Sequence, residues 1–196
     1  MARGLKRKRS MTIAVVAPDF SSFVASITPI VEQVIEKQRY SLIICNFQGN
    51  KEKLRKKLKF LKERFVDGII LFPSNLATAS IDILQHYIAE KIPIVLIDHL
   101  IPEVETDAII VDNVNASFRA VERLILENHS KIALIDGPTD SYVSQERLRG
   151  YYEAMQTYNL DILDNWIIRG DFSRTGGYQA VKQLYMSSLR PTAIYV

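Results

Sequence analysis

The chain has 196 residues, of which 47% are hydrophobic and 24% are charged, and its formal net charge is +3. This balance fits a soluble globular protein of one or two domains. Every apolar run is shorter than the roughly 18 residues that a membrane-spanning helix needs. A single cysteine, Cys45, excludes an internal disulfide and favours a reducing compartment. We therefore expect a cytoplasmic protein that makes no membrane contact.

The positive charge is concentrated at the start of the chain. Residues 1–10 hold five Lys and Arg residues and no acidic residue, so the remainder is close to neutral. This start resembles a signal peptide, but the apolar run behind it is too short and ends at Pro18 and Asp19. A solvated terminus is the commoner meaning of such a charge run, and the alternative is the end of a segment that leads to DNA. The body of the chain is not basic enough to bind nucleic acid through its overall charge.

Short apolar runs recur along the chain, and each ends abruptly in a polar residue or Pro. They cover residues 12–17, 42–45, 69–72, 94–97, 109–111 and 132–135. Strands that are apolar along their whole length are buried on both faces, which is typical of a parallel sheet covered by helices. Ligands bind such sheets outside the carboxyl ends of the strands. We therefore expect function at the polar residues that end these runs.

The stretches between the runs have helical periodicity, so strands and helices are expected to alternate in right-handed crossovers. In the first half we expect strands at 12–17, 41–46, 68–72, 94–97 and 108–111, with helices at about 23–38, 51–65 and 80–89. In the second half we expect helices at about 115–127, 144–158 and 173–185, with strands at 131–135, 166–168 and 193–196. The second helix has an apolar stripe of Leu54, Leu58, Leu61 and Phe65 opposite a basic face. We interpret that basic face as solvated, with a phosphate-binding face as the alternative.

Three regions follow from this order: a basic linker at 1–10, a first lobe at 11–113 and a second lobe at 114–196. The last expected strand is the end of the sequence, with no helix after it to cover the sheet. Since natural domains seldom stop in this way, we expect the second lobe to be incomplete and the sequence to be a fragment.

Sequence signatures of catalysis are absent. The chain has no dinucleotide fingerprint, no phosphate-binding P-loop and no nucleophile elbow. Its three histidines, His86, His99 and His129, have no second ligand at metal-binding spacing. Cys45 and His99 both lie at strand ends and could pair as nucleophile and base, although a buried Cys is more often a small apolar group. We expect no enzyme activity, no metal and no cofactor.

Nine strings, in order, resemble the effector-binding core of the lactose/galactose-repressor (LacI/GalR) family of bacterial transcription regulators. They are TIAVVAPDFSSF, YSLIICN, RFVDGIILFPS, IPIVLIDH, IIVDN, KIALIDGP, RLRGYYEAM, GDFSRTGGYQAV and RPTAIYV, and they span almost all of residues 11–196. The resemblance implies an α/β fold of the type I periplasmic-binding-protein kind, with two lobes that each contain a parallel sheet flanked by helices.

The resemblance also implies a function. Members of this family bind a sugar or a similar small effector between the two lobes and act as homodimers or tetramers. They bind operator DNA through an N-terminal helix-turn-helix domain, which this sequence lacks. We therefore expect a ligand-sensing regulatory domain with a small-molecule effector and a homodimeric partner. The alternatives are a solute-binding protein of a transport system and, less favoured, an enzyme on a flavodoxin-like sheet.

Candidate effector contacts follow from the same resemblance, position by position. They are Asp19, Phe20, Ser22 and Phe23 after the first strand, Asp98 after the fourth, Arg147 in QERLRGY and Phe172 in GDF. Carboxylates and Arg make directional hydrogen bonds to hydroxyl groups, and aromatic faces pack on sugar rings or purines. Three simpler roles stay open: an ion pair of Arg147 with Glu146 or another acid of its helix, a core position for Phe172, and a helix or turn cap for Asp98.

Overall fold

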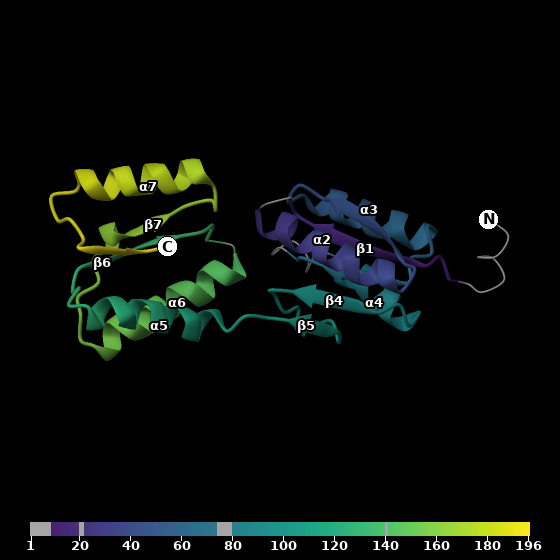
Figure 1. Ribbon diagram of the computed structural model, residues 1–196, viewed down its shortest axis with the longest axis horizontal. Coiled ribbons are helices and arrows are strands. Elements are labelled where there is room, and N and C mark those ends of the chain that lie inside the picture. The colour runs from purple at the N-terminus through teal and green to yellow at the C-terminus, as the bar shows by residue number, and fades with distance from the viewer. Residues whose placement is uncertain (1–8, 20–21, 74–79, 140) are drawn as a thin grey trace. The chain divides into compact units, whose positions relative to one another are not determined.

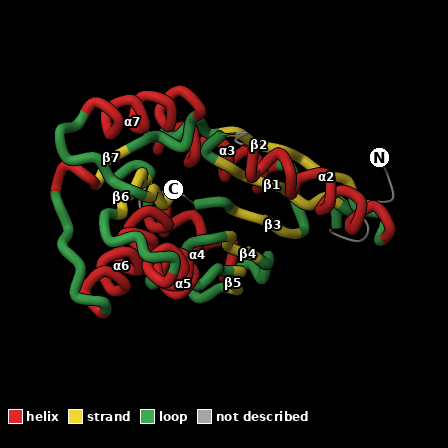
Figure 2. Tube along the Cα trace, turned by 60° about the vertical axis from the view of Figure 1, so that its left-hand side comes forward, coloured by secondary structure: helices red, strands yellow, loops and turns green. Residues whose placement is uncertain are grey.

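The computed structural model describes residues 9–19, 22–73, 80–139 and 141–196, and the chain divides into two compact units, residues 1–110 and 111–196. Strands and helices alternate within each unit, except that the last two strands of the first unit follow one another (Figures 1 and 2). The first unit contains β1 (Thr12–Ala17), α2 (Ser22–Lys37), β2 (Ser41–Asn46), α3 (Lys51–Glu63), β3 (Gly68–Leu71), α4 (Ile81–Ala89), β4 (Ile94–Ile97) and β5 (Asp107–Ile109). The second contains α5 (Asn113–Leu126), β6 (Ile132–Asp136), α6 (Tyr142–Thr157), the 3-10 helix η2 (Asp164–Trp166), β7 (Ile167–Arg169), α7 (Arg174–Met186) and β8 (Ala193–Tyr195).

The first unit is built on a parallel five-stranded sheet in the order β2-β1-β3-β4-β5. Successive residues of β1 point to opposite faces of the sheet, and each face has its own layer of apolar side chains. Val15 and Ala17 pack on the α2 side, whereas Ala14 and Val16 pack with α3 and α4 on the opposite side. Because both faces are covered, the buried positions of β1, residues 14–17, are all apolar.

The second unit contains a parallel three-stranded sheet in the order β7-β6-β8. Its central strand β6 is buried throughout. Ile132 and Leu134 face α5 and α6, whereas Ala133 and Ile135 face α7. Figure 1 shows α7 on one face of this sheet and α5 with α6 on the other. Two units, each with a parallel sheet flanked by helices, confirm the predicted fold class.

One predicted core position is wrong. Phe65 lies beyond α3, which ends at Glu63, and its side chain is 73% exposed. The chain reverses here with Phe65 in the left-handed backbone region (φ 55°), and the N–H of Val66 bonds back to Leu61. Val66 is buried in place of Phe65. The helical spacing predicts the buried positions Leu54, Leu58 and Leu61 correctly. It does not extend to Phe65, because the end of the helix changes the direction of the side chains that follow.

None of the described helices is long and apolar enough to cross a membrane.

Candidate functional site

The carboxyl edge of the second sheet brings a buried acid opposite a basic residue. Asp136 ends β6 and Arg169 ends β7, and the parallel register places them as direct neighbours. The Asp136 side chain is 1% exposed and forms an ion pair with the Arg169 guanidinium. The backbone N–H of Gly137 donates to the other carboxylate oxygen at 2.8 Å. This edge therefore presents a fixed, hydrogen-bonded carboxylate at the end of the central strand.

Burial also affects the ionisation of this carboxylate. It raises the pKa of Asp136 above its ordinary value of 3.8, because the ionised form loses hydration. The hydrogen bond from Gly137 and the positive charges of Arg169 and Arg147 act on the pKa in the opposite direction. A carboxylate with a raised pKa inside a depression of the surface is a common mark of a functional site.

A pocket of about 330 Å³ opens at this edge of the second unit. It is lined by Leu134, Ile135, Asp136, Gly137, Arg147, Gly170, Asp171, Phe172, Ser173, Arg174, Gly177, Tyr195 and Val196. The lining combines apolar side chains with carboxylate and guanidinium groups, as small-molecule sites do. Two of the predicted contacts, Arg147 and Phe172, line this one pocket although they come from different segments of the chain.

Phe172 is not a core residue. Its side chain is 62% exposed, and its backbone occupies the left-handed region with φ 61°. This conformation is costly for an aromatic residue. The ring lies directly against Gly137, where an added Cβ would overlap the ring atoms. The small residue after β6 thus makes room for an aromatic face at the pocket, and the core alternative for Phe172 is wrong.

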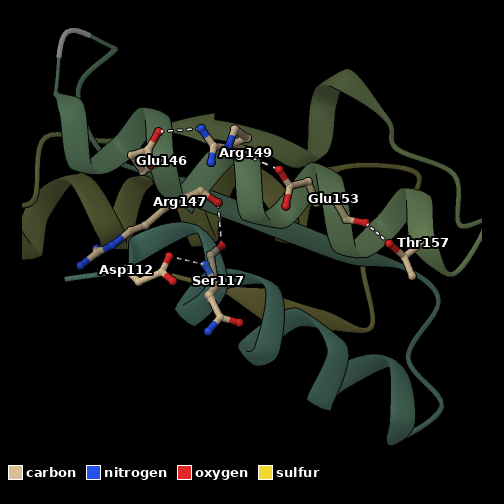
Figure 3. A network of polar contacts seen from close by, with 8 residues as sticks. Asp112, Ser117, Glu146, Arg147, Arg149, Glu153 and Thr157 are labelled. Carbon is tan, nitrogen blue, oxygen red and sulfur yellow. Dashed lines mark hydrogen bonds and ion pairs between the residues drawn. The ribbon is translucent and has the colours of Figure 1, made fainter.

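Arg147 is positioned by the packing of α6 on α5. Ser117 of α5 donates to the Arg147 backbone oxygen at 2.6 Å, and Arg147 Nε donates to Asn113 Oδ1 at 3.4 Å. Glu146 pairs with Arg149 instead, at 3.3 Å. In Figure 3, Arg149 turns toward Glu146 and Glu153, whereas the Arg147 side chain extends in the other direction. The alternative of an Arg147–Glu146 ion pair is therefore wrong.

The other predicted contacts fall in the first unit, where the described ones follow strands of its sheet or lie on α2. Asp19 follows β1 and is exposed, and Asp98 follows β4 with φ 62°, its N–H bonded to the Ile109 oxygen at 2.8 Å. The Phe23 ring packs edge-on against Phe72, with centroids 6.1 Å apart. Phe20 and the side chain of Ser22 lie outside the described part of the structure. Asp98 is followed by a loop and not by a helix.

The catalytic alternative is not supported by the sheet order. Cys45 lies on β2 and His99 follows β4, and β1 and β3 stand between these strands. Three strand spacings separate the two side chains by about 14 Å, which is beyond hydrogen-bond reach. Burial also raises the pKa of the Cys45 thiol and lowers that of His99, which disfavours the thiolate–imidazolium form. Cys45 is a buried member of the first core.

Among the charged residues that line the pocket, sequence reasoning missed Asp136, Asp171 and Arg174. The signal for Asp136 was present, since it is the polar residue that ends the apolar run 132–135. Its selection required the register that sets it beside Arg169. Nothing in the sequence around Arg174 indicated a position in the pocket, because a basic residue at the start of a helix is usually solvated. Among the described residues, no group of three or more His, Cys, Asp and Glu side chains is arranged to hold a metal ion.

Comparison with known proteins extends over both units. The family described as periplasmic binding proteins and the sugar binding domain of the LacI family matches residues 9–196. The chain is 31% identical over 196 residues to the ribose operon repressor of Escherichia coli (strain K12), covering all of this chain and 59% of that protein. It is 33% identical over 198 residues to the HTH-type transcriptional repressor PurR of Aliivibrio fischeri (strain MJ11), covering 100% of this chain and 58% of that protein.

Solved structures show the same fold. The transcription regulator CcpA of Lactococcus lactis is 25% identical, with a TM-score of 0.76 over 93% of this chain and 66% of that chain. The chain spans less than two thirds of the length of the curated relatives above. The periodicity of the strands, the fold of both units and the match over residues 9–196 agree: the chain belongs to the family of periplasmic binding proteins and LacI-type sugar-binding domains.

Proposed function

We propose that this chain is the effector-binding regulatory core of a bacterial transcription regulator and that it performs no catalysis. The observation that carries the proposal is the pocket of the second unit, where Arg147, Phe172 and Asp136 meet at the carboxyl edge of a parallel sheet. Guanidinium and carboxylate groups bond to hydroxyl groups with defined geometry, and an exposed aromatic face packs on the C–H face of a sugar. The effector is a sugar or a molecule of similar chemistry.

The names of the relatives favour regulation over transport. The ribose operon repressor and PurR are transcriptional repressors, so a solute-binding protein is the weaker alternative. Operator binding by the whole protein, through a separate domain, is part of this proposal. The protein then acts in the cytoplasm, where operator DNA is found. Asp19, Phe20, Ser22, Phe23 and Asp98 remain proposed effector contacts of the first unit, on the strength of the family resemblance.

The proposal includes a homodimer. Apolar side chains of α2 and of the edge strand β2 are exposed on one side of the first unit: Ile30 (61%), Val34 (57%) and Ile44 (46%). Ile30 and Val34 are four residues apart and share a helix face, and Ile44 points to the α2 side of the sheet, like Leu42. Contiguous exposed apolar surface favours association. Analytical ultracentrifugation should show a dimer, and the Val34→Glu substitution should convert it to a monomer. If the unsubstituted chain is already a monomer, the proposed homodimer is contradicted.

Effector binding can be tested directly by calorimetry and by thermal denaturation. A panel of monosaccharides, nucleosides and purine bases is added to the chain, because a ligand that binds only the folded form raises its melting temperature. We expect at least one compound to bind, and Arg147→Ala to abolish or strongly weaken that binding. If neither this panel nor the phosphate and carboxylate derivatives of its sugars change the melting temperature, or if Arg147→Ala has no effect on the affinity, the proposed function fails.

A further inference from the structure

Two guanidinium groups of the second-unit pocket have no carboxylate within ion-pair distance among the described residues. Arg147 reaches the pocket from α6, and Arg174 reaches it from the first residue of α7. Within the described ranges, the side chain of Arg147 makes one hydrogen bond, a long one to the neutral amide of Asn113. Other exposed arginines of this unit, such as Arg123 and Arg149, do form ion pairs with neighbouring acids. The two pocket arginines therefore keep their charge available for a ligand.

The two acids of the same pocket are already engaged with the protein. Asp136 is paired with Arg169. Asp171 accepts the Ser173 N–H at 2.9 Å, and its hydrogen bonds from Ser173 lower its pKa. Asp171 also lies against Gly176 in the first turn of α7. Its negative charge there is attracted to the positive end of the helix dipole. Because Arg169 pairs with Asp136, three guanidinium groups stand against two carboxylates at this pocket, which leaves a net positive charge beside Arg147 and Arg174.

We propose that the effector carries an oxyanion, a phosphate ester or a carboxylate, which Arg147 and Arg174 bind together while the rest of the molecule packs against Phe172. This inference rests on the proposed function and names the chemical class of its ligand. A neutral sugar would cover two charged groups and replace their water with weaker partners. An oxyanion instead forms charge-assisted, bidentate hydrogen bonds with guanidinium groups.

The test compares ligands that differ only in charge. Calorimetry on the 196-residue chain uses D-ribose, D-ribose 5-phosphate and D-ribonate, with the matching set of D-glucose, D-glucose 6-phosphate and D-gluconate, at one ionic strength. Inorganic phosphate alone is a further arm, because it separates recognition of the free ion from recognition of the sugar anion. We expect an anionic member to bind at least about tenfold more tightly than its neutral partner, as for a gained charge-assisted contact.

Variants connect this preference to the two arginines. Arg174→Gln should reduce the affinity for the preferred anion at least about tenfold and leave the affinity for the neutral partner within about twofold, since only the charge interaction is lost. Arg190→Gln is the matched control. Arg190 stacks on the Tyr185 ring at 4.5 Å and does not line the pocket, so both affinities should stay unchanged. The melting temperature of each variant without ligand verifies that it is folded.

The outcomes separate the inference from the proposed function. If a neutral sugar binds as tightly as its anion, or if Arg174→Gln weakens both equally, the oxyanion proposal is overturned while effector binding stands. Tight binding of inorganic phosphate with no gain from the sugar would overturn both the sugar class and the role of Phe172. If no compound binds, both the inference and the proposed function fail.

Discussion

At the scale of single residues, position rather than residue type distinguishes Arg147 from its neighbour Arg149. Both lie on α6, but Arg149 pairs with Glu146 and Glu153 on the surface, whereas Arg147 lines the pocket. We expect Arg147→Ala to cost about 2–4 kcal/mol of effector binding, as for a lost charge-assisted and partly buried hydrogen bond. Arg149→Ala should leave binding unchanged, because exposed ion pairs contribute little. Calorimetry showing equal affinity for both variants would remove Arg147 from the site.

Asp136 predicts a pH dependence with a defined sign. Its pKa is raised above 3.8, so the folded chain binds more protons than the unfolded chain between 3.8 and the raised pKa. Ionisation of Asp136 therefore lowers stability progressively as pH rises through this window, and its effect is constant above it. The difference in unfolding free energy between the wild type and Asp136→Asn should fall over that range, as measured by urea denaturation at a series of pH values.

Asp171 provides the control for this experiment, because the shift of its pKa has the opposite direction. Hydrogen bonds from Ser173 lower the pKa of Asp171 below 3.8. Ionised Asp171 therefore adds to the free energy of unfolding at pH values above its pKa in the unfolded chain. This contribution is lost as the pH falls through its pKa in the folded chain. The difference in unfolding free energy between the wild type and Asp171→Asn should rise with pH below about 4. It should be small, since the Asp171 side chain is exposed. Curves with the same sign for both variants would contradict the assigned environments.

At the scale of elements, the close approach of α5 and α6 holds Arg147 in place. Gly150 of α6 faces the Val114 oxygen and the Ser117 side chain of α5, and an added Cβ would collide with both. Because a backbone oxygen cannot move without shifting the helix, Gly150→Ala should destabilise the chain by about 1–3 kcal/mol. Gly177, inside α7, has open space around the same position. Gly177→Ala should therefore stabilise by about 0.5–1 kcal/mol, through helix propensity.

Urea denaturation of these two glycine variants separates packing from propensity. Both substitutions replace a mid-helix glycine by alanine, so propensity alone predicts a gain in stability for each. A stabilised Gly150→Ala variant would show that α5 and α6 are not in the close contact described here. A loss of effector affinity in Gly150→Ala, beyond its loss of stability, would show that the helix contact also positions Arg147.

At the scale of the whole molecule, the two units differ in how well their sheets are enclosed. Among the described strands, β1, β3 and β4 of the first unit each have a strand on both sides, and in the second unit this is true of β6 alone. The second unit also exposes large apolar side chains along α7, among them Tyr178, Tyr185 and Met186. Fewer enclosed strands leave more backbone hydrogen bonds near solvent, so opening there should cost less free energy.

Hydrogen exchange should therefore be faster across residues 114–196 than across residues 12–98. Mass spectrometry of exchanged, protease-digested chain gives the rate for each segment, and a peptide covering β6 should be the slowest of the second unit. Equal protection in the two regions of a monomer would show that the second unit is as well enclosed as the first. The exposed apolar surface also predicts self-association, which added sugar effector should reduce if the ligand orders this unit.

The sequence by itself determined the fold class. Buried parallel strands must be apolar at each position, so the six runs, the alternation with helices and most element boundaries could be predicted from composition and periodicity alone. Deviations occurred where a chain reversal decides the side-chain direction, as at Phe65. The family could be identified from the ordered strings, and with it Arg147 and Phe172 as candidate contacts. These two needed the resemblance, because neither residue type is informative on its own.

Only the tertiary structure decided how the candidate site is composed. The pairing of Asp136 with Arg169 depends on strand register, and a shift of one residue would turn either side chain to the other face. The position of the Phe172 ring depends on Gly137, which leaves room for it after β6. The net positive charge around Arg147 and Arg174 depends on the pairing of Asp136 with Arg169 rather than with either of them. Each of these is a relation between residues far apart in the chain, and local sequence patterns carry no information about such distances.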